Sequence, residues 1–192
     1  MIDCNRCPQL TVRPARARDL PELADLLTES FHPPDGWMMK LAYPLLRLGI
    51  YEDLRSRLRR NQRDHVCLVA TCPQESNREE ILLGTVELAL GTQSREERSH
   101  PYPYLSNLAV RPQWRRQGVA QQLLVACEQI AQSAGQHSLY LHVLENNYSA
   151  RKLYSRIGYR LQTLDQHWSF WVLGRPRRML LCRTFDLTTA QS

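Results

Sequence analysis

The stretch from Tyr104 to Leu144 constrains the fold more than any other part of this chain. Its centre, from Gly118 to Ala134, carries small and apolar residues at the spacing of one helix face, and Gly135 ends the helix. The residues on that face are Val119, Leu123, Ala126, Cys127, Ile130 and Ala134. Strand-forming runs flank the helix, Tyr104–Val110 before it and Ser138–Leu144 after it. A strand, a helix and a strand in this order predict a right-handed parallel unit.

The N-terminal third is predicted to be mainly helical after one short strand. Asp19 is a suitable helix cap, Pro21 fits a first turn, and leucines follow at helical spacing. Pro44 and Gly49 are expected to interrupt the second helical stretch, since proline removes a backbone donor and glycine breaks the pattern. The predicted elements are a strand over Leu10–Pro14, a helix from Asp19 to about Phe31, and a helical stretch from about Trp37 to Arg60.

Strands dominate the rest of the sequence. The polar loop Pro73–Glu80 predicts that the two strands beside it form an antiparallel hairpin. Gly158 ends a short helix, and Gly174 with Pro176 marks the turn between the last two strands. The predicted elements are strands over His65–Thr71, Ile81–Leu90, Tyr159–Phe170 and Arg178–Phe185, and a helix over Tyr148–Ile157.

Length and composition favour one folded domain over residues 1–192. A chain of 192 residues is of ordinary single-domain size, and 43% hydrophobic with 23% charged residues is typical of a globular protein. The ends, 1–9 and 187–192, are expected to be flexible. No apolar run reaches the ~18 residues of a membrane span, and Met1–Gln9 lacks the apolar core of a secretory signal. We therefore expect a cytoplasmic protein without a membrane partner.

The net charge of +6 suits an anionic ligand, but it equally suits nucleic acid or an acidic membrane surface. Basic residues are densest between Arg55 and Arg63. Their spacing fits the solvated side of an amphipathic helix that carries Leu54 and Leu58 on its other side. A patch for polyanions is the alternative.

The cysteines point to reduced thiols rather than to disulfides or metal. Cys67, Cys127 and Cys182 lie in apolar runs, where a reduced cysteine behaves as a small hydrophobe. Cys4 and Cys7 form a single CxxC pair, and a zinc site needs a second pair of ligands that the sequence does not offer. We therefore expect no metal.

The loop between the strand ending at Val110 and the following helix is suited to binding phosphate. The first amides of a helix have no internal partners and lie at the positive end of its dipole. Gln117, Gly118, Val119 and Ala120 would donate these N–H groups to a pyrophosphate, and glycine allows close approach to the backbone. Arg115 and Arg116 add positive charge, although one of them would also fit in a solvated position. The loop has neither Walker A nor G-x-G-x-x-G spacing.

Two linked motifs resemble those of the GNAT superfamily of acyl-CoA-dependent N-acyltransferases. The first is Leu108-Ala109-Val110 followed by Arg115-Arg116-Gln117-Gly118-Val119-Ala120. The second runs from Asn147 to Tyr159 and matches N-x-x-A-x-x-L-Y-x-x-x-G-F/Y. Both occur in the family's order, and together they cover about residues 104–159. The first motif also looks similar to cyanobacterial and plastid GNAT proteins, so the plastid stroma is a second possible location.

The resemblance implies a fold, a cosubstrate and site residues. The fold is α/β (α+β), with a mixed central sheet of about six or seven strands flanked by about four helices. Acetyl-CoA is the implied acetyl donor. Backbone groups of Leu108, Ala109 and Val110 would pair with its pantetheine arm, and residues Arg115 to Gln121 would hold its pyrophosphate. Asn147, Tyr148 and Ser149 would contact the other side of the cofactor, and Tyr154 would reach the thioester.

Tyr154 is predicted to be the general acid. It would protonate a thiolate whose conjugate acid resembles a thiol of pKa ~8.5, whereas a tyrosine has a pKa near ~10 and is protonated at neutral pH. The alternative role of Tyr154 is structural, since it shares a helix stripe with Ala150, Leu153 and Ile157.

The general base is not identified by the sequence. An amine of pKa ~10.4 is mostly cationic at pH 7 and must lose a proton. Many GNAT relatives use a glutamate on the strand before the pyrophosphate loop, but Tyr102–Asn107 contains no carboxylate. Glu87, His142 and a water relay are the candidates. Both side chains would also fit as polar residues at a strand surface.

The acceptor is expected to be a protein N-terminus or lysine, with a small arylalkylamine such as serotonin, or a polyamine, as the alternative. The resemblance places the acceptor pocket at Phe31–Arg60 and Asp165–Arg178. Its aromatic and apolar candidates are Trp37, Met38, Trp168, Phe170 and Trp171. A hypothesis from another class is a non-catalytic basic module that binds RNA or protein through Arg55–Arg63. We expect a monomer or homodimer, with no nucleic-acid partner.

Overall fold

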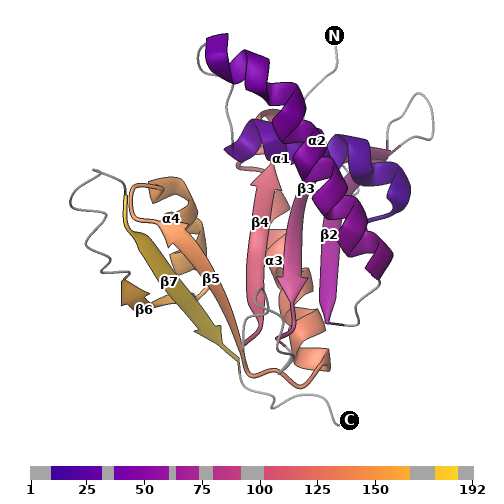
Figure 1. Cartoon of the computed structure of the whole chain (residues 1–192). Helices are drawn as coiled ribbons and strands as arrows, with labels where there is room; N and C mark the ends of the chain where they lie inside the picture. Colours follow the sequence, from indigo (N-terminus) through magenta and orange to yellow (C-terminus); the bar gives the residue numbers. More distant parts are fainter. Residues whose placement is uncertain are drawn as a thin grey trace. The chain divides into compact units, whose positions relative to one another are not determined.

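The computed structural model describes residues 10–31, 37–60, 64–73, 80–91, 102–164 and 176–185. The side chains of residues 37–41 and 59–60 are outside this description. Within it lie seven strands and four α-helices, as the resemblance implied. The strands are β1 (Thr11–Pro14), β2 (His65–Pro73), β3 (Glu80–Ala89), β4 (Tyr104–Val110), β5 (Ser138–Leu144), β6 (Arg160–Leu164) and β7 (Arg178–Thr184). The helices are α1 (Leu20–Phe31), α2 (Trp37–Arg60), α3 (Val119–Ser133) and α4 (Tyr148–Arg156) (Figure 1).

The strands form one mixed sheet in the order β1-β2-β3-β4-β5-β7-β6. β4 and β5 run parallel, which confirms the parallel unit predicted from the strand, helix and strand between Tyr104 and Leu144. β5 pairs antiparallel with β7, which in turn pairs antiparallel with β6. The order of the last three strands places β7 between β5 and β6.

The chain divides into two compact units that interleave in sequence. Unit 1 contains residues 1–88 and 107–127, and unit 2 contains residues 89–106 and 128–192. The phosphate-binding loop belongs to unit 1, and the helix with Tyr154 belongs to unit 2. The single domain over 1–192 stays a prediction.

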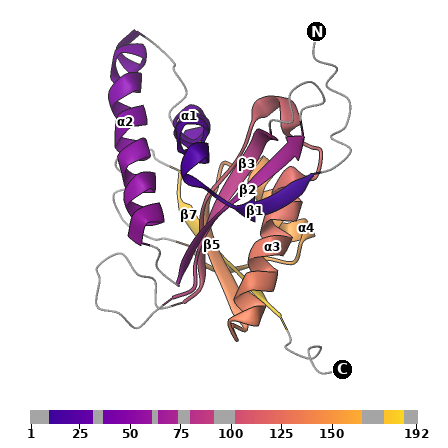
Figure 2. The ribbon, with the colours of Figure 1, turned by 90° about the vertical axis from the view of Figure 1, so that its right-hand side faces the viewer.

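Unit 1 is built around leucines contributed by α1, α2 and the strands. Leu23 and Leu26 are completely buried because α1 presents its apolar stripe to the core that Val69 and Leu82 also form. Leu54 brings α2 into the same core. α1 and α2 lie on one side of the strands and α3 on the other (Figure 2).

α2 is continuous, so the predicted interruption at Pro44 and Gly49 is wrong. Pro44 lies inside the helix, where it costs one backbone hydrogen bond. Packing of α2 against the rest of unit 1 offsets that cost. Leu54 is buried, and an ion pair joins Arg47 of α2 to Asp25 of α1. Tertiary contacts therefore override the local helix-breaking signal.

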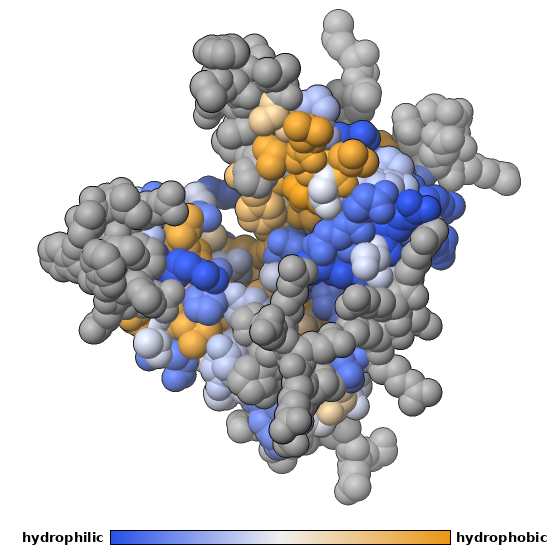
Figure 3. All heavy atoms as spheres, viewed as in Figure 1, coloured by the Kyte–Doolittle hydropathy of each residue, from blue (hydrophilic) through white to orange (hydrophobic). Residues whose placement is uncertain are grey.

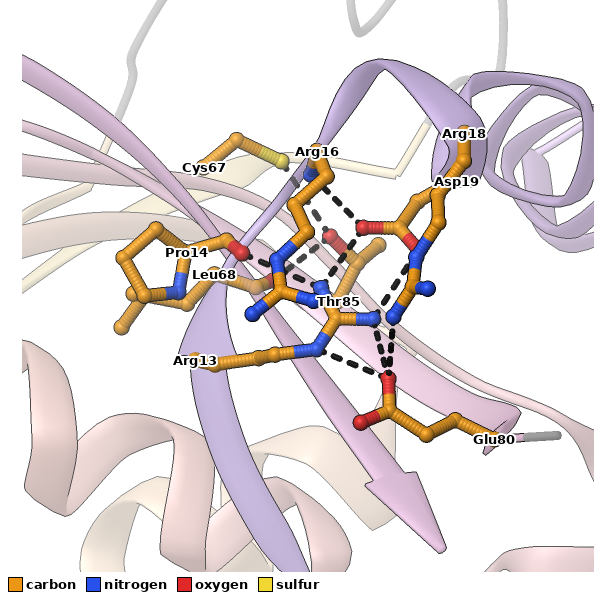
Figure 4. Close-up of polar contacts among 9 residues, drawn as sticks. All are labelled: Arg13, Pro14, Arg16, Arg18, Asp19, Cys67, Leu68, Glu80 and Thr85. Carbon is orange, nitrogen blue, oxygen red and sulfur yellow. Dashed lines mark hydrogen bonds and ion pairs between the residues drawn. The ribbon is translucent and has the colours of Figure 1, made fainter. Parts of the chain in front are cut away.

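The start of α1 is fixed by a charged cluster. Arg13 of β1 donates to Asp19 at 2.7 Å and to Glu80 at 2.6 Å (Figure 4). The Asp19 carboxylate also accepts the backbone N–H of Arg16 at 2.6 Å, as the third residue of a capping box at the 3-10 turn Ala17–Asp19 that leads into α1. Burial alone would raise the pKa of Asp19, but Arg13 and the Arg16 amide outweigh burial and lower it.

Unit 2 packs α4 with β5, β6 and β7. Tyr154 and Tyr159 are buried with ring centroids 5.8 Å apart, and Leu139 and Leu141 of β5 are buried as well. Gly158 has a φ of 99°, which explains why α4 ends where the sequence predicted. β6 is described only to Leu164, so the predicted end of this strand at Phe170 lies outside the described residues.

The cysteines bear out the prediction in part. Cys67, Cys127 and Cys182 are free thiols, as expected. Cys72 is disulfide-bonded, which corrects the expectation of reduced cysteines. Cys4 and Cys7 lie outside the described residues, as do the ends that we expect to be flexible.

Candidate functional site

The predicted phosphate-binding loop has an unusual backbone in unit 1. After β4, Pro112–Trp114 form a 3-10 turn, and α3 begins at Val119. Arg116 has a φ of 64° and Gly118 a φ of 84°, both in the left-handed region. Gly118 adopts this conformation at little cost, whereas Arg116 is strained. The two turns expose residues Arg115 to Gly118 at the start of the helix.

The backbone amides of this loop are unsatisfied. Within the described part of the chain, the N–H groups from Arg116 to Gln121 have no hydrogen-bond acceptor. Ordinary pairing resumes at Gln122, whose N–H donates to the Gly118 carbonyl at 3.0 Å. A Cβ built on Gly118 would meet no atom within 4 Å, so the backbone there is open to a ligand. The geometry is that of an anion site at a helix N-terminus.

Two side chains of the loop donate to backbone carbonyls, and a third makes no ion pair with a described carboxylate. Arg115 Nε donates to the Val110 carbonyl at 3.1 Å, and the Gln117 amide donates to the Gln113 carbonyl at 3.1 Å. Arg116 is exposed and makes no ion pair with any described carboxylate. Its charge is therefore available to an anion, in addition to the helix dipole.

β4 leads into the loop and is held firmly at its end. Arg111 donates its backbone N–H to the Leu83 carbonyl at 2.9 Å and its Nε to the Leu82 carbonyl at 2.8 Å. The register of β4 with β5 comprises only Tyr104 and Leu105. Leu108, Ala109 and Val110 are not in that register. One acceptor position of the Val110 carbonyl is occupied by Arg115.

The second motif forms the N-terminal half of α4 in unit 2. Asn147 caps the helix, since its Oδ1 accepts the Ala150 N–H at 3.1 Å, which leaves the side-chain NH₂ to donate elsewhere. Tyr148 is 74% exposed, and Arg151 lies 5.7 Å from its ring centroid. Ser149 is exposed beside them. These residues are accessible to a ligand.

Tyr154 lies on the buried side of the same helix and is 7% exposed. Its hydroxyl has no hydrogen-bond partner among the described residues. Burial, with a smaller contribution from Tyr104, raises the pKa of Tyr154 to about 12. The phenol therefore keeps its proton throughout the neutral range.

Glu87 on β3 is completely enclosed, which corrects the prediction of a strand-surface position. It is 1% exposed. Arg57 and His65 donate to one carboxylate oxygen at 2.6 and 3.1 Å, and Asn107 donates to the other at 3.0 Å. Burial would raise the pKa of Glu87, but the three partners outweigh it, so the pKa is lowered and the carboxylate stays ionised.

Sequence reasoning missed the partners of Glu87, and a signal for them was present. β3 reads as an almost continuous apolar run with one carboxylate inside it. A charge buried in such a strand requires cationic or amide partners. Asn107 has a φ of 52°, a left-handed conformation that asparagine tolerates better than most residues.

His142 on β5 is half-buried and is engaged with a neighbouring strand. Its Nδ1 lies 2.7 Å from the Tyr104 hydroxyl. Burial is the main cause that raises the pKa of Tyr104. His142 therefore contributes to a polar pair in unit 2 rather than standing at an open surface, as the sequence had suggested.

The acceptor region is described in part. The side chains of Trp37 and Met38, and residues Trp168, Phe170 and Trp171, lie outside the described residues. Along the middle of α2, Leu45 and Leu48 are 74% and 57% exposed, and hydrophobic side chains gather there (Figure 3). Towards its C-terminal end, Arg55 pairs with Glu52 and Arg57 with Asp53 and Glu87. Arg57 thus faces buried Glu87 rather than solvent, and the side chains of Arg59, Arg60 and Arg63 lie outside the described residues, so both interpretations of Arg55–Arg63 stay predictions.

The described residues contain neither a metal-binding cluster nor a membrane-spanning helix. They contain no cluster of three or more His, Cys, Asp or Glu side chains arranged for a metal ion. None of the helices in the described ranges has the length and hydropathy needed to span a bilayer.

A mixed sheet whose third helix starts with exposed, unpaired backbone amides has the geometry that a phosphate-bearing cosubstrate requires. The Acetyltransferase (GNAT) family model matches residues 20–159. The chain therefore belongs to the GNAT family, which confirms the family inferred from the two motifs.

Curated relatives and solved structures agree with this assignment. GCN5-related N-acetyltransferase 10, chloroplastic, of Arabidopsis thaliana is 31% identical over 165 residues, which are 82% of this chain and 64% of the relative. GCN5-related N-acetyltransferase 7, chloroplastic, of the same plant is 35% identical over 78 residues, which are 41% of this chain and 28% of the relative. This chain thus spans less than two thirds of the length of either relative.

Among solved structures, the PaiA N-acetyltransferase of Thermoplasma acidophilum in complex with coenzyme A is similar with a TM-score of 0.68 and 18% identity. That match covers 92% of this chain and 99% of the other. The ribosomal-protein-S18-alanine N-acetyltransferase of Escherichia coli matches with a TM-score of 0.64 and 16% identity, over 95% and 97% of the two chains. At these identities the likeness shows the GNAT fold.

Proposed function

We propose that this protein transfers the acetyl group of acetyl-CoA to a primary amine. One observation carries the proposal: the consecutive backbone amides from Arg116 to Gln121 lack acceptors among the described residues and surround a glycine open to ligand. Membership of the GNAT family supports the pyrophosphate of acetyl-CoA as the anion.

Each binding residue has a role that its surroundings support. The amides of Gln117, Gly118, Val119 and Ala120 would bind the pyrophosphate, with Arg116 adding charge. Backbone groups of Leu108 to Val110 would pair with pantetheine. Asn147, whose side-chain NH₂ is not used by the cap, would donate to the cofactor beside Tyr148 and Ser149.

The reaction requires two proton movements. The amine nitrogen attacks the thioester carbon, the C–S bond breaks, and the Tyr154 hydroxyl donates its proton to the departing sulfur. With the pKa of Tyr154 at about 12 and that of a thiol near ~8.5, this transfer is uphill by about 3.5 pKa units, or roughly 5 kcal/mol. The cost is larger than an unperturbed tyrosine would impose, yet it is compatible with an enzymatic barrier.

The surroundings of Glu87 and His142 favour a water relay as the base. Glu87 is held ionised by Arg57, His65 and Asn107, and its lowered pKa makes it a weak base toward an ammonium of pKa ~10.4. The Nδ1 of His142 is engaged with Tyr104. A water that delivers the amine proton to solvent needs neither side chain to leave its partners.

We infer a protein N-terminus or lysine as the acceptor. A small arylalkylamine is the second candidate, because exposed Leu45 and Leu48 offer apolar surface on the helix where the family builds its acceptor pocket. The names of the chloroplast relatives favour the plastid stroma over the cytoplasm as the location.

The test compares two glycines at opposite ends of α3. Gly118 and Gly135 have φ values of 84° and 75°, and a Cβ on either meets nothing within 4 Å. Gly118→Ala and Gly135→Ala therefore impose the same backbone strain, roughly 1–2 kcal/mol. Only Gly118→Ala should also weaken coenzyme A binding, by about tenfold or more, as measured by titration calorimetry. Equal affinities in the two variants would remove the loop from the site.

Acceptor identity requires a turnover assay on the unmodified protein. Thiol release from acetyl-CoA would be followed with a peptide bearing a free N-terminus, a lysine peptide, spermidine and serotonin. Turnover with only one acceptor class would identify that class as the substrate. Coenzyme A binding without turnover, together with RNA binding that falls steeply with salt, would instead favour the non-catalytic module.

A further inference from the structure

Positive side chains without carboxylate partners gather on the outer part of unit 2. Several basic side chains elsewhere in the described ranges pair with acids: Arg13 with Asp19, Arg57 with Glu87, and Arg183 with Glu128 at 2.7 Å. On α4 and β6, Lys152, Arg156 and Arg160 are exposed and make no ion pair with a described residue. This segment of 9 helical and 5 strand residues carries no acidic side chain.

A groove lies beside two of these cations, Lys152 of α4 and Arg160 of β6. It has a volume of about 490 Å³, and Arg151, Lys152 and Arg160 line it together with Leu161, Met179 and Leu181. Leu161 and Leu181 are cross-strand partners of β6 and β7, so their side chains share one face of the sheet, and Met179 follows two residues away on that face. The groove therefore combines an aliphatic surface with a positive border.

One apolar side chain of the groove, Leu161, is open to solvent, whereas Leu181 is buried and Met179 is partly buried. Leu161 is 52% exposed, an unusual position for a leucine beside a buried cross-strand partner. Cations held near one another without carboxylates repel, and exposed apolar area costs free energy. An occupant with both negative charge and aliphatic side chains would relieve both costs.

We propose that this groove binds an acidic segment of a partner protein in which carboxylates alternate with aliphatic residues. An extended peptide presents side chains to opposite sides in turn, which suits a groove with an aliphatic floor and a positive border. The groove includes neither the loop of unit 1 nor Tyr154, and it shares Tyr148 with the proposed acetyl-CoA site.

The aromatic residues of the groove favour a peptide over single-stranded nucleic acid. Nucleotide binding without sequence preference depends on exposed aromatic faces for base stacking. The Tyr148 ring already has the Arg151 guanidinium 5.7 Å from its centroid, and Tyr159 is only 2% exposed. The groove therefore offers one exposed ring, Tyr148, whose face is shared with Arg151, rather than the series of rings on which successive bases stack.

The experiment uses the whole chain and a fluorescein-labelled octapeptide of alternating glutamate and leucine, with binding followed by anisotropy. Arg160→Glu should weaken binding of this peptide at least tenfold, because it replaces a border cation with an anion. Arg156→Glu is the matched control: it changes the same charge on exposed α4, but Arg156 does not line the groove. It should alter the affinity less than threefold. The midpoint of urea unfolding reports that each variant is folded.

Three results would overturn the proposal. The first is no detectable binding of the octapeptide to the unaltered protein. The second is equal weakening by Arg156→Glu and Arg160→Glu, which would mean a general response to net charge. The third is tighter binding of a labelled oligothymidylate than of the peptide at the same salt concentration, with the same dependence on Arg160, which would make nucleic acid the occupant.

Discussion

Glu87 of unit 1 and Tyr154 of unit 2 are both buried titratable groups, yet their surroundings fix opposite protonation states. Glu87 is 1% exposed and accepts hydrogen bonds from Arg57, His65 and Asn107. Tyr154 is 7% exposed and has no hydrogen-bond partner among the described residues. Donors outweigh burial at Glu87 and lower its pKa, whereas burial dominates at Tyr154 and raises its pKa to about 12.

The contrast separates a structural charge from a group that can react. A carboxylate committed to three donors contributes to the fold of unit 1, and using it as a base would mean disrupting those contacts. A buried phenol without a partner has no such commitment and keeps a proton to donate. Both groups are buried, so the hydrogen-bond donors around each group, more than its burial, predict whether its pKa is lowered or raised.

The largest expected effect is on catalysis by Tyr154→Phe. The substitution keeps the ring and its packing against Tyr159 but removes the donor. We expect kcat to fall about 10²- to 10⁴-fold, with the KM for acetyl-CoA changed less than threefold. Steady-state thiol release with the best acceptor measures both constants.

Tyr159→Phe is the control for this substitution, since it removes a hydroxyl from the other buried ring of the same pair. Its kcat should stay within about threefold of the unaltered protein, as expected for a group outside the reaction. If Tyr154→Phe turns over as fast as Tyr159→Phe, the helix-stripe interpretation of Tyr154 is correct and the acid lies elsewhere.

The next largest effect is on stability, from Glu87→Gln. The amide keeps the shape of the side chain but removes the charge that Arg57 and His65 address, so the free energy of unfolding should fall by about 2 to 4 kcal/mol. Urea unfolding measures this change. Glu145→Gln, which affects an exposed pair with Arg177 at 3.7 Å, should cost less than about 1 kcal/mol. Similar costs for the two variants would show that the Glu87 cluster is not a structural charge.

The sequence predicted the elements whose signals are local. α3 has a complete apolar stripe and a terminal glycine, and β5 was predicted with the bounds that the structure has. The exposed, unpaired amides of the loop before α3 were also predictable, because they follow from the start of a helix after a glycine. The roles of this loop, Asn147 and Tyr154 come from the two motifs and stay predictions.

The parts that sequence reasoning missed depend on residues brought together by the sheet. Arg57 is 30 residues from Glu87 in sequence and Asn107 is 20, and pairing of separate elements makes them neighbours. α2 was predicted to break at Pro44 because the local penalty was visible while the burial of Leu54 against α1 was not. Propensity is a weak guide where packing decides.

The pH dependence of the free energy of unfolding should separate Tyr154 from Glu87, because Tyr154 affects it at alkaline pH and Glu87 at acidic pH. An unfolded tyrosine loses its proton near pH ~10, but folded Tyr154 keeps it to about pH 12, so its contribution is complete below pH 10 and is lost as the pH rises through 12. The loss attributable to Tyr154 is roughly 2 to 3 kcal/mol. Urea unfolding of Tyr154→Phe between pH 9 and 12 should lack this component.

The lowered pKa of Glu87 predicts a loss of stability as the pH falls into the acidic range. Its contribution is complete above the unfolded pKa of about 4.3 and is lost as the pH falls through the lower folded value. The stability difference between the unaltered protein and Glu87→Gln should therefore shrink as the pH falls from 6 to 3. A difference that is constant over this range would mean that the carboxylate charge is not what stabilises unit 1.

The smallest effect tests how Glu87 acts on the strand that leads to the phosphate-binding loop. Asn107→Gly relieves a left-handed backbone conformation with a φ of 52° but removes the donor to Glu87, so the two effects oppose each other. We expect a net loss of about 1 kcal/mol in urea unfolding. In the Glu87→Gln background the donor has lost its charged acceptor, and the glycine should then cost less. A double-mutant cycle should give a coupling of about 1 kcal/mol, whereas a coupling near zero would mean that Glu87 and Asn107 stabilise unit 1 independently.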